Sequence, residues 1–111
     1  MYMKKNLPKK QGIKHFEPHS VLYLTGDANY SRIHLLNGKV FLSSYNLKWF
    51  AQKWPSFLRL HKQALVNPAY VHHLSVAPTL QSASYVVMQD QVQLPISRRR
   101  VSGIVYHFRQ V

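Results

Sequence analysis

The chain has 111 residues, of which 46% are hydrophobic, and this is enough for one domain with one hydrophobic core. It has no cysteine, which excludes disulfides and cysteine-ligated metal sites, and no apolar run close to the roughly 20 residues that span a bilayer. Fifteen Lys and Arg residues face three acidic residues, and the resulting net charge of +12 favours nucleic acid as the partner without choosing between DNA and RNA.

The first 18 residues are rich in lysine, contain two prolines and show no hydrophobic period. We interpret residues 1–18 as a flexible basic arm, with at most a short strand near Ile13 to Phe16, and residues 19–111 as the folded domain. No apolar stretch follows the early charges, so the N-terminus is not a secretory signal. Together with the missing cysteine and membrane span, this predicts a cytoplasmic protein.

The first half of the domain reads as strands followed by a helix. The alternation of Tyr30, Arg32 and His34 with apolar or small residues is typical of a half-buried strand, and the Asn37-Gly38 dipeptide predicts a tight hairpin turn. An apolar stripe at helical spacing follows, with Ser44 as the expected N-cap. The predicted elements are strands at 21–25, 30–36 and 39–43, a turn at 26–29, and a helix with Leu47, Phe50, Ala51 and Trp54 on its core side that ends at Pro55.

The second half reads as further short strands and a closing helix. We expect strands at 57–60 and 71–77, irregular backbone at 61–70, and a last hairpin over 84–96 that turns at Asp90-Gln91. The sum is a β-rich α+β domain of small antiparallel sheets with two short helices.

The closing helix raises a question about its charges. Ser97 is its expected N-cap, and Val101, Ile104, Val105 and Phe108 form its apolar stripe. The first turn then holds Arg98, Arg99 and Arg100, although the partial charge at a helix N-terminus is already positive. We expect an external polyanion to supply the missing negative charge, with Arg98 and Arg99 facing it and Arg100 in solvent.

Catalytic and metal sites are not indicated. Acid–base or two-metal catalysis usually needs paired carboxylates, and the three acids are scattered. Among the seven histidines, His72 and His73 would point to opposite faces of a strand, and His34 and His61 show no ligand spacing. No glycine-rich phosphate loop is present. We therefore predict a protein that is not an enzyme and that needs no cofactor or metal.

Basic and polar residues instead gather at the ends of predicted elements. Any one of them alone is more often an ordinary solvated residue, but three such groups without an acid suit a face that follows phosphates and contacts bases. The candidate DNA-binding residues are Asn29, Tyr30, Ser31, Arg32, Arg59, His61, Lys62, Gln63, Arg98 and Arg99.

The sequence resembles the LytTR DNA-binding domain of bacterial response regulators over about residues 19–108. The resemblance is carried by "VLYLTGDANYSRIHLLNGKVF", "SSYNLKWFAQKWPSFLRLHKQALVNPAYV" and "VQLPISRRR". Its two most specific parts are the spaced motif Phe57, Arg59, His61, Lys62, Val66 and Asn67, and the closing motif Leu94, Pro95, Ile96, Ser97, Arg98 and Arg99.

This resemblance implies an elongated β-rich domain whose loops enter successive major grooves and bend the DNA, commonly as a pair on two direct repeats. Carried over by motif, the contacting positions are the region of Tyr30 and Ser31, then His61 and Lys62, then Arg98. The sequence departs from the family at Thr25, where an acid is usual, and at Lys62, where the usual residue is Arg. Lysine keeps the charge and loses the bidentate fork, so it suits a phosphate better than a base.

Family members usually carry a receiver domain before this domain, so the chain is either a stand-alone regulator or a fragment, and any separate signalling partner is unknown. We interpret it as a sequence-specific bacterial transcription regulator that binds double-stranded DNA. It is expected to be a monomer when free, because the core uses the apolar stripes of both helices, and to pair on DNA. The alternative is a basic RNA-binding or structural module without sequence specificity. An ordered array of exposed aromatic residues would favour this alternative.

Overall fold

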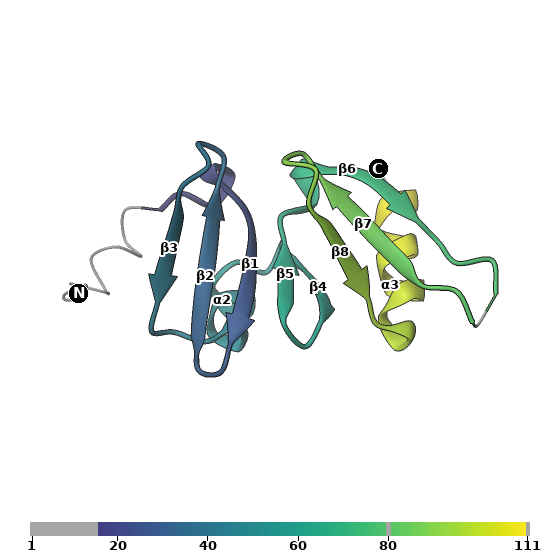
Figure 1. The fold of residues 1–111 in the computed structure, drawn as a ribbon, viewed down its shortest axis with the longest axis horizontal. Coiled ribbons are helices and arrows are strands. Elements are labelled where there is room, and N and C mark those ends of the chain that lie inside the picture. The colour runs from purple at the N-terminus through teal and green to yellow at the C-terminus, as the bar shows by residue number, and fades with distance from the viewer. Residues whose placement is uncertain (1–15, 80, 111) are drawn as a thin grey trace.

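The structure is a computed structural model that describes residues 16–79 and 81–110 (Figure 1). It is an elongated domain of 46 × 27 × 25 Å, and the predicted β-rich fold with antiparallel sheets and two helices is confirmed. In chain order the elements are η1 (Pro18–Ser20), β1 (Val21–Asp27), β2 (Tyr30–Leu35), β3 (Val40–Ser43), α2 (Leu47–Lys53), β4 (Leu58–His61), β5 (Ala64–Val66), η2 (Pro68–Tyr70), β6 (Val71–Ser75), β7 (Ser84–Met88), β8 (Gln93–Ile96) and α3 (Arg98–Arg109).

The strands form two antiparallel sheets that lie side by side along the long axis (Figure 1). The larger sheet has the order β3-β2-β1-β5-β4, and the smaller has the order β6-β7-β8. The predicted alternation along β2 is confirmed, because Ser31, Ile33 and Leu35 are buried while Tyr30 and Arg32 are exposed. Helix α2 packs against the larger sheet, and α3 packs near β4 beside the smaller one.

Two hydrophobic clusters stand where the sequence predicted one core. The first is rich in aromatic side chains and joins α2 to the larger sheet. It consists of Val21, Leu24, Ile33, Leu35, Leu47, Phe50, Trp54, Phe57 and Leu65. Phe50 is fully buried at its centre, since its ring contacts those of Trp49 and Trp54 at centroid distances of 5.0 and 5.1 Å.

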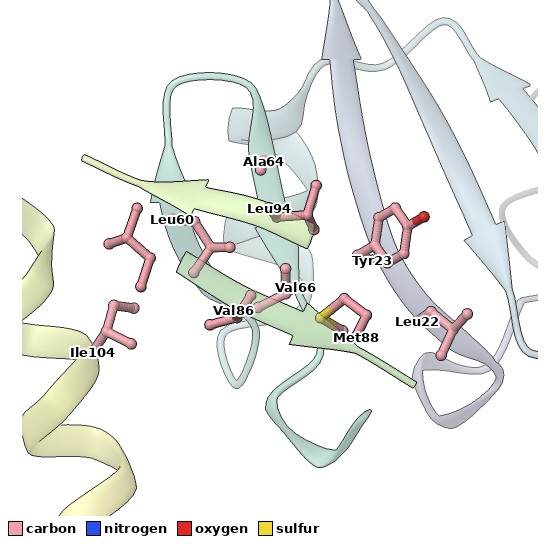
Figure 2. Packing of buried hydrophobic residues seen from close by; sticks show 10 residues of the cluster. Leu22, Tyr23, Leu60, Ala64, Val66, Val86, Met88, Leu94 and Ile104 are labelled. Atoms are coloured by element: carbon pink, nitrogen blue, oxygen red, sulfur yellow. The ribbon is translucent and has the colours of Figure 1, made fainter. Parts of the chain in front are cut away.

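The second cluster joins the two sheets and α3 (Figure 2). It is largely aliphatic and draws on residues far apart in the chain, from β1 through β4, β5, β7 and β8 to α3. Its members are Leu22, Tyr23, Leu60, Ala64, Val66, Val86, Met88, Leu94, Ile96 and Ile104. Strands β1 and β5 contribute to both clusters, so the domain is one unit with two cores.

A polar contact reinforces the junction of the two sheets. The Tyr23 hydroxyl on β1 donates to Asp90 Oδ2 in the β7–β8 turn at 2.9 Å, and the Tyr23 ring stacks on His34 at 4.3 Å. Burial first, and then the bond to Asp90, raise the pKa of Tyr23 far above its ordinary value. His34 Nε2 lies 3.0 Å from Thr25 Oγ1, so the threonine that stands where the family usually has an acid is a hydrogen-bond partner of a β2 side chain.

The expectation of irregular backbone at 61–70 is wrong in part. Ala64–Val66 is β5, which is fully buried and pairs with both β1 and β4. A three-residue apolar run is too short to show a period, although its burial between two strands is typical of a central strand. Asn67 then accepts from Ala69 N and donates to Val21 O, and the predicted strand at 71–77 ends at Ser75.

The N-caps differ from those expected. Asn46, and not Ser44, caps α2 by accepting from Trp49 N at 2.9 Å. Ser97 stands at the predicted start of α3 but makes no capping bond, and its hydroxyl is buried without a hydrogen-bond partner among the described residues. The helix instead depends on its apolar face, on which Ile104 is buried and Val101 and Phe108 pack against the second cluster.

The predicted tight turns are confirmed. Gly38 has a positive φ of 88° in the β2–β3 turn, and Gln91 has a φ of 73° in the β7–β8 turn. His72 and His73 are both exposed on β6, an edge strand of the smaller sheet whose register with β7 shifts between Val71 and His73. Of the predicted basic arm, residues 1–15 lie outside the described part. The Phe16 ring packs on that of Phe41 at 5.0 Å.

Candidate nucleic-acid interface

The three groups of candidate residues lie along one long edge of the domain. Figure 1 shows the β1–β2 turn, the β4–β5 turn and the β8–α3 junction at the lower edge, and the β2–β3 and β7–β8 turns at the upper edge. Two backbone hydrogen bonds of 2.9 Å tie the lower edge together, one from Gly26 N to Gln63 O and one from Ser97 N to Leu60 O. These bonds link the three loops to one another, and the side chains of the second cluster pack between β4, β5, β8 and α3.

The β1–β2 turn presents Asn29 and Tyr30 to solvent, and Tyr30 is 49% exposed. Ala28, the first turn residue, has a φ of 57°, a conformation that costs a residue with a Cβ about 1–2 kcal/mol. Strained backbone of this kind concentrates at functional sites, where the surrounding structure holds it in place. The pairing of Asp27 with Tyr30 across the turn provides that support.

Two other candidates in this region differ from the expectation. Ser31 is fully buried, and its hydroxyl donates to Tyr45 O at 2.8 Å, so the strand alternation that buries it also removes its side chain from the candidate interface. Arg32 is exposed and forms a salt bridge of 2.8 Å with Asp27. The expectation of an interface without acids is therefore wrong. The two opposite charges were visible in the sequence five residues apart; Asp27 pairs directly with Tyr30, and Arg32 lies diagonally opposite Asp27 on the same face.

The β4–β5 turn is organised by its own side chains. Arg59 donates from Nε to His61 O at 3.0 Å and from Nη2 to Lys62 O at 2.8 Å, so its guanidinium holds the turn. Gln63 N donates to His61 Nδ1 at 3.1 Å. The neutral imidazole of His61 therefore carries its hydrogen on Nε2, where it can donate to a base or phosphate. Lys62 and Gln63 are exposed at the tip.

Positive charge is concentrated between this turn and α3. Burial, then Arg59 and then Arg100 lower the pKa of His61 below its ordinary value, so its neutral form prevails at neutral pH. Burial and Arg100 also lower the pKa of Arg59. An anion placed here would relieve repulsion between cations that the protein itself does not neutralise.

At the start of α3, Arg98 and Arg99 are exposed and Arg100 is half-buried. The expectation that Arg100 is the solvated member of the three is wrong, because its charge acts on Arg59 and His61 in the neighbouring turn. Because Arg100 lies two residues after Arg98, its side chain points toward a different side of the helix. Arg100 is thus a residue of this edge that sequence reasoning missed.

The edge has the chemistry of a nucleic-acid surface. It presents guanidinium, ammonium, imidazole and amide donors over a molecule 46 Å long, while successive turns of a DNA groove recur about every 34 Å. Within residues 16–79 and 81–110 no group of three His, Cys, Asp or Glu side chains could hold a metal ion. In the same residues no helix has the length and apolar character needed to cross a membrane.

Comparison with known proteins agrees with this geometry. The family model for the LytTr DNA-binding domain matches residues 11–108. The chain belongs to this family. The LytTR domain is a DNA-binding domain of transcription regulators and not a catalytic fold.

A solved structure shares the fold. It is described as the LytTr DNA-binding domain of a methyl-accepting/DNA response regulator from Bacillus cereus, and it superposes with a TM-score of 0.69 over 80% of this chain and 81% of that chain, at 20% identity. A search of curated proteins gives no significant match.

Proposed function

We propose that this LytTR domain is a sequence-specific transcription regulator that binds double-stranded DNA through the three loops of its lower edge. The observation that carries the proposal is the convergence of three polar and basic loops, from distant parts of the chain, on one edge where backbone hydrogen bonds link them. A rigid array of donors suits base reading, because specificity requires each donor to meet its base edge in register.

The side chains of the three loops are suited to different contacts with DNA. Arg98 is exposed, carries the bidentate fork that guanine O6 and N7 accept, and is the proposed main base contact. His61 and Gln63 offer donors at the tip of the central turn, while Lys62 suits a phosphate. Asn29 and Tyr30 provide the third contact. The guanidinium groups of Arg32 and Arg59 already have hydrogen-bond partners in the protein. We therefore assign a phosphate contact to Arg99 in preference to these two arginines.

We further propose that the protein is a monomer when free and pairs on direct repeats of DNA. The exposed apolar side chains of the described residues are concentrated at Leu36 and Val40–Leu42, next to and on the edge strand β3. Such a patch is far smaller than the roughly 20–30 residues that each partner gives to a stable interface. Since DNA is the ligand, we place the protein in the cytoplasm, where bacterial DNA lies.

The test is a comparison of duplex DNA, single-stranded DNA and RNA over a range of salt concentrations. Each phosphate neutralised in a duplex contributes about −0.9 to the slope of log K against log salt. Tight binding to duplex DNA, a steep negative slope and a preference among duplex sequences are expected. A slope near zero, or equal affinity for RNA and duplex DNA, would overturn the proposal in favour of a basic module without specificity.

A further inference from the structure

A small hollow beside the central turn has no role in the interface described so far. It has a volume of about 160 Å3 and is lined by Gly26, Ala28, Asn46, Leu47, Lys48, Arg59, Lys62 and Gln63. Three elements meet in it, namely the β1–β2 turn, the first turn of α2 and the β4–β5 turn. Helix α2 had been assigned only to the core, through Leu47 and Phe50.

The hollow is positively charged and has no acid in its lining. Three of its residues, Lys48, Arg59 and Lys62, are cations, and the two lysines are exposed. The acid nearest in sequence, Asp27, is engaged by Arg32 at 2.8 Å and does not line the hollow. The cations therefore lack a counter-charge among the described residues that form this site.

Gly26 shapes one wall. A Cβ at this position would lie 2.5 Å from Gln63 Oε1 and 3.2 Å from Leu47 Cδ1, so any larger residue would displace the Gln63 side chain from its place against β1. The hydrogen bond from Gly26 N to Gln63 O joins the backbone of β1 to the β4–β5 turn. Lys62, the neighbour of Gln63, lines the same hollow as Lys48 of α2.

The size of the hollow limits what it can bind. Sites for drug-sized molecules have volumes of roughly 300–1,000 Å3, which is well above this one. A phosphate group is small enough, carries the needed negative charge and accepts hydrogen bonds from ammonium groups on two sides. Because the hollow adjoins the candidate DNA-binding turns, a phosphodiester of the same DNA is the ligand that reaches it.

We propose that this hollow binds one backbone phosphate of DNA between Lys48 and Lys62, so that α2 forms a fourth contact beside the three loops. The inference rests on the proposed DNA-binding function. It assigns Lys48 a role that neither the family motifs nor the sequence pattern indicated. The contact positions the domain on the duplex and carries no sequence information.

The test is the salt dependence of duplex binding by the full chain and five variants, K48A, K48R, K39A, K62A and K48A/K62A. Losing one phosphate contact lowers the slope by about 0.9, which makes the change in Kd over a fourfold rise in salt about 3.5-fold smaller. We expect this for Lys48→Ala, equally on all duplex sequences. Lys48→Arg should keep the slope, because it keeps the charge.

Two features keep this test separate from the proposed function. Lys39→Ala removes the same charge from the β2–β3 turn on the opposite edge and should leave the slope unchanged. Lys48→Ala and Lys62→Ala should be non-additive in binding free energy, since both side chains hold the same phosphate. If the wild type binds duplexes with a steep slope while Lys48→Ala behaves as Lys39→Ala does, the phosphate site is wrong. If the wild type itself shows no such slope, the proposed function fails.

Discussion

The two hydrophobic clusters differ in how they are assembled and in what they support. The first draws on residues 21–65 and combines six aliphatic side chains with the aromatic rings of Phe50, Trp54 and Phe57. The second draws on residues from 22 to 104 and is largely aliphatic. The first cluster packs α2 against β1, β2 and β5, whereas the second packs β4, β5, β7 and β8 against α3. We therefore expect the second cluster to have the greater part in aligning the β4–β5 turn with the start of α3.

The largest expected effect on stability comes from truncating a buried side chain in either core. Phe50→Ala in the first cluster should lower the free energy of unfolding by about 3–5 kcal/mol, and Leu60→Ala in the second by about 2–5 kcal/mol. Both side chains are fully buried. Urea unfolding measures both losses, and Leu36→Ala, at an exposed position, is the control that should change little.

Substitutions in the two cores should also differ in their effect on DNA binding. Leu60 O accepts from Ser97 N, so a repacked second core moves the β4–β5 turn relative to α3. Under conditions where both variants remain folded, Leu60→Ala should bind duplex DNA more weakly than Phe50→Ala does. Equal affinities of the two variants would contradict the division of roles between the cores.

The next effect concerns a side chain that the second core positions. Arg98→Ala should cost about 1–3 kcal/mol of binding free energy at the preferred site and relax the preference at one base pair. Arg98→Lys should restore little, because an ammonium lacks the guanidinium fork. The melting temperature should hold or rise, since a cation leaves the first turn of a helix.

The measurement is a binding series on single-base variants of the site, with a thermal melt of each protein. Arg109→Ala, at the far end of the same helix, is the matched control and should leave the base preference intact. A sharp fall in the melting temperature of Arg98→Ala with unchanged base preference would assign this arginine to the fold.

A smaller effect distinguishes the ends of the two helices. Asn46→Ala should lower the free energy of unfolding by about 1 kcal/mol, because Asn46 caps α2, whereas Ser44→Ala should not. Ser97→Ala should be neutral or stabilising, because its buried hydroxyl has no partner to lose among the described residues. Chemical denaturation compares the three, and a loss for Ser97→Ala as large as for Asn46→Ala would contradict the cap assignments.

The smallest effect is a pH dependence at the junction between the sheets. Burial lowers the pKa of His34 below its ordinary value of 6.5; the charge of Asp90 opposes this shift, and the charge of Arg32 adds to it by a smaller amount. The unfolded chain then binds the proton more readily, so the stability that His34 contributes is fully present above about pH 6.5 and is lost as the pH falls through the lowered pKa. Thermal melts should show a lower melting temperature at about pH 5.5 than at about pH 7.5.

Replacing His34 by Gln should reduce this dependence and leave the part that comes from His61, whose pKa is also lowered, while replacing His72, which is exposed on β6, should leave it unchanged. An identical pH dependence in the His34→Gln variant would show that another group is responsible.

The sequence predicted what depends on local chemistry. The Asn37-Gly38 turn, the apolar stripe of α2 and the alternation of β2 all follow from residue spacing, and the structure confirms them. Strand β5 and the second cluster were missed because they depend on long-range pairing. Ala64 is buried only because β1 and β4 lie on either side of it.

The candidate site was likewise predicted in part from the sequence. The motifs located the three loops, and the exposure of Lys62, Gln63, Arg98 and Arg99 agrees with the expectation. The strand alternation already implied that Ser31 faces the core, yet the motif match ranked it as a contact. Arg100 and Lys48 could not be assigned from spacing, because their surroundings come from elements distant in sequence.

Contact between one long edge of the domain and the DNA can be measured by amide chemical-shift mapping of the isotopically labelled protein, titrated with a short duplex. We expect shift changes to concentrate at Asn29–Tyr30, His61–Gln63 and Arg98–Arg100, with none at the β2–β3 and β7–β8 turns of the opposite edge. Changes that concentrate at Asn37–Lys39 or Gln89–Val92 while the three loops stay unperturbed would contradict this expectation.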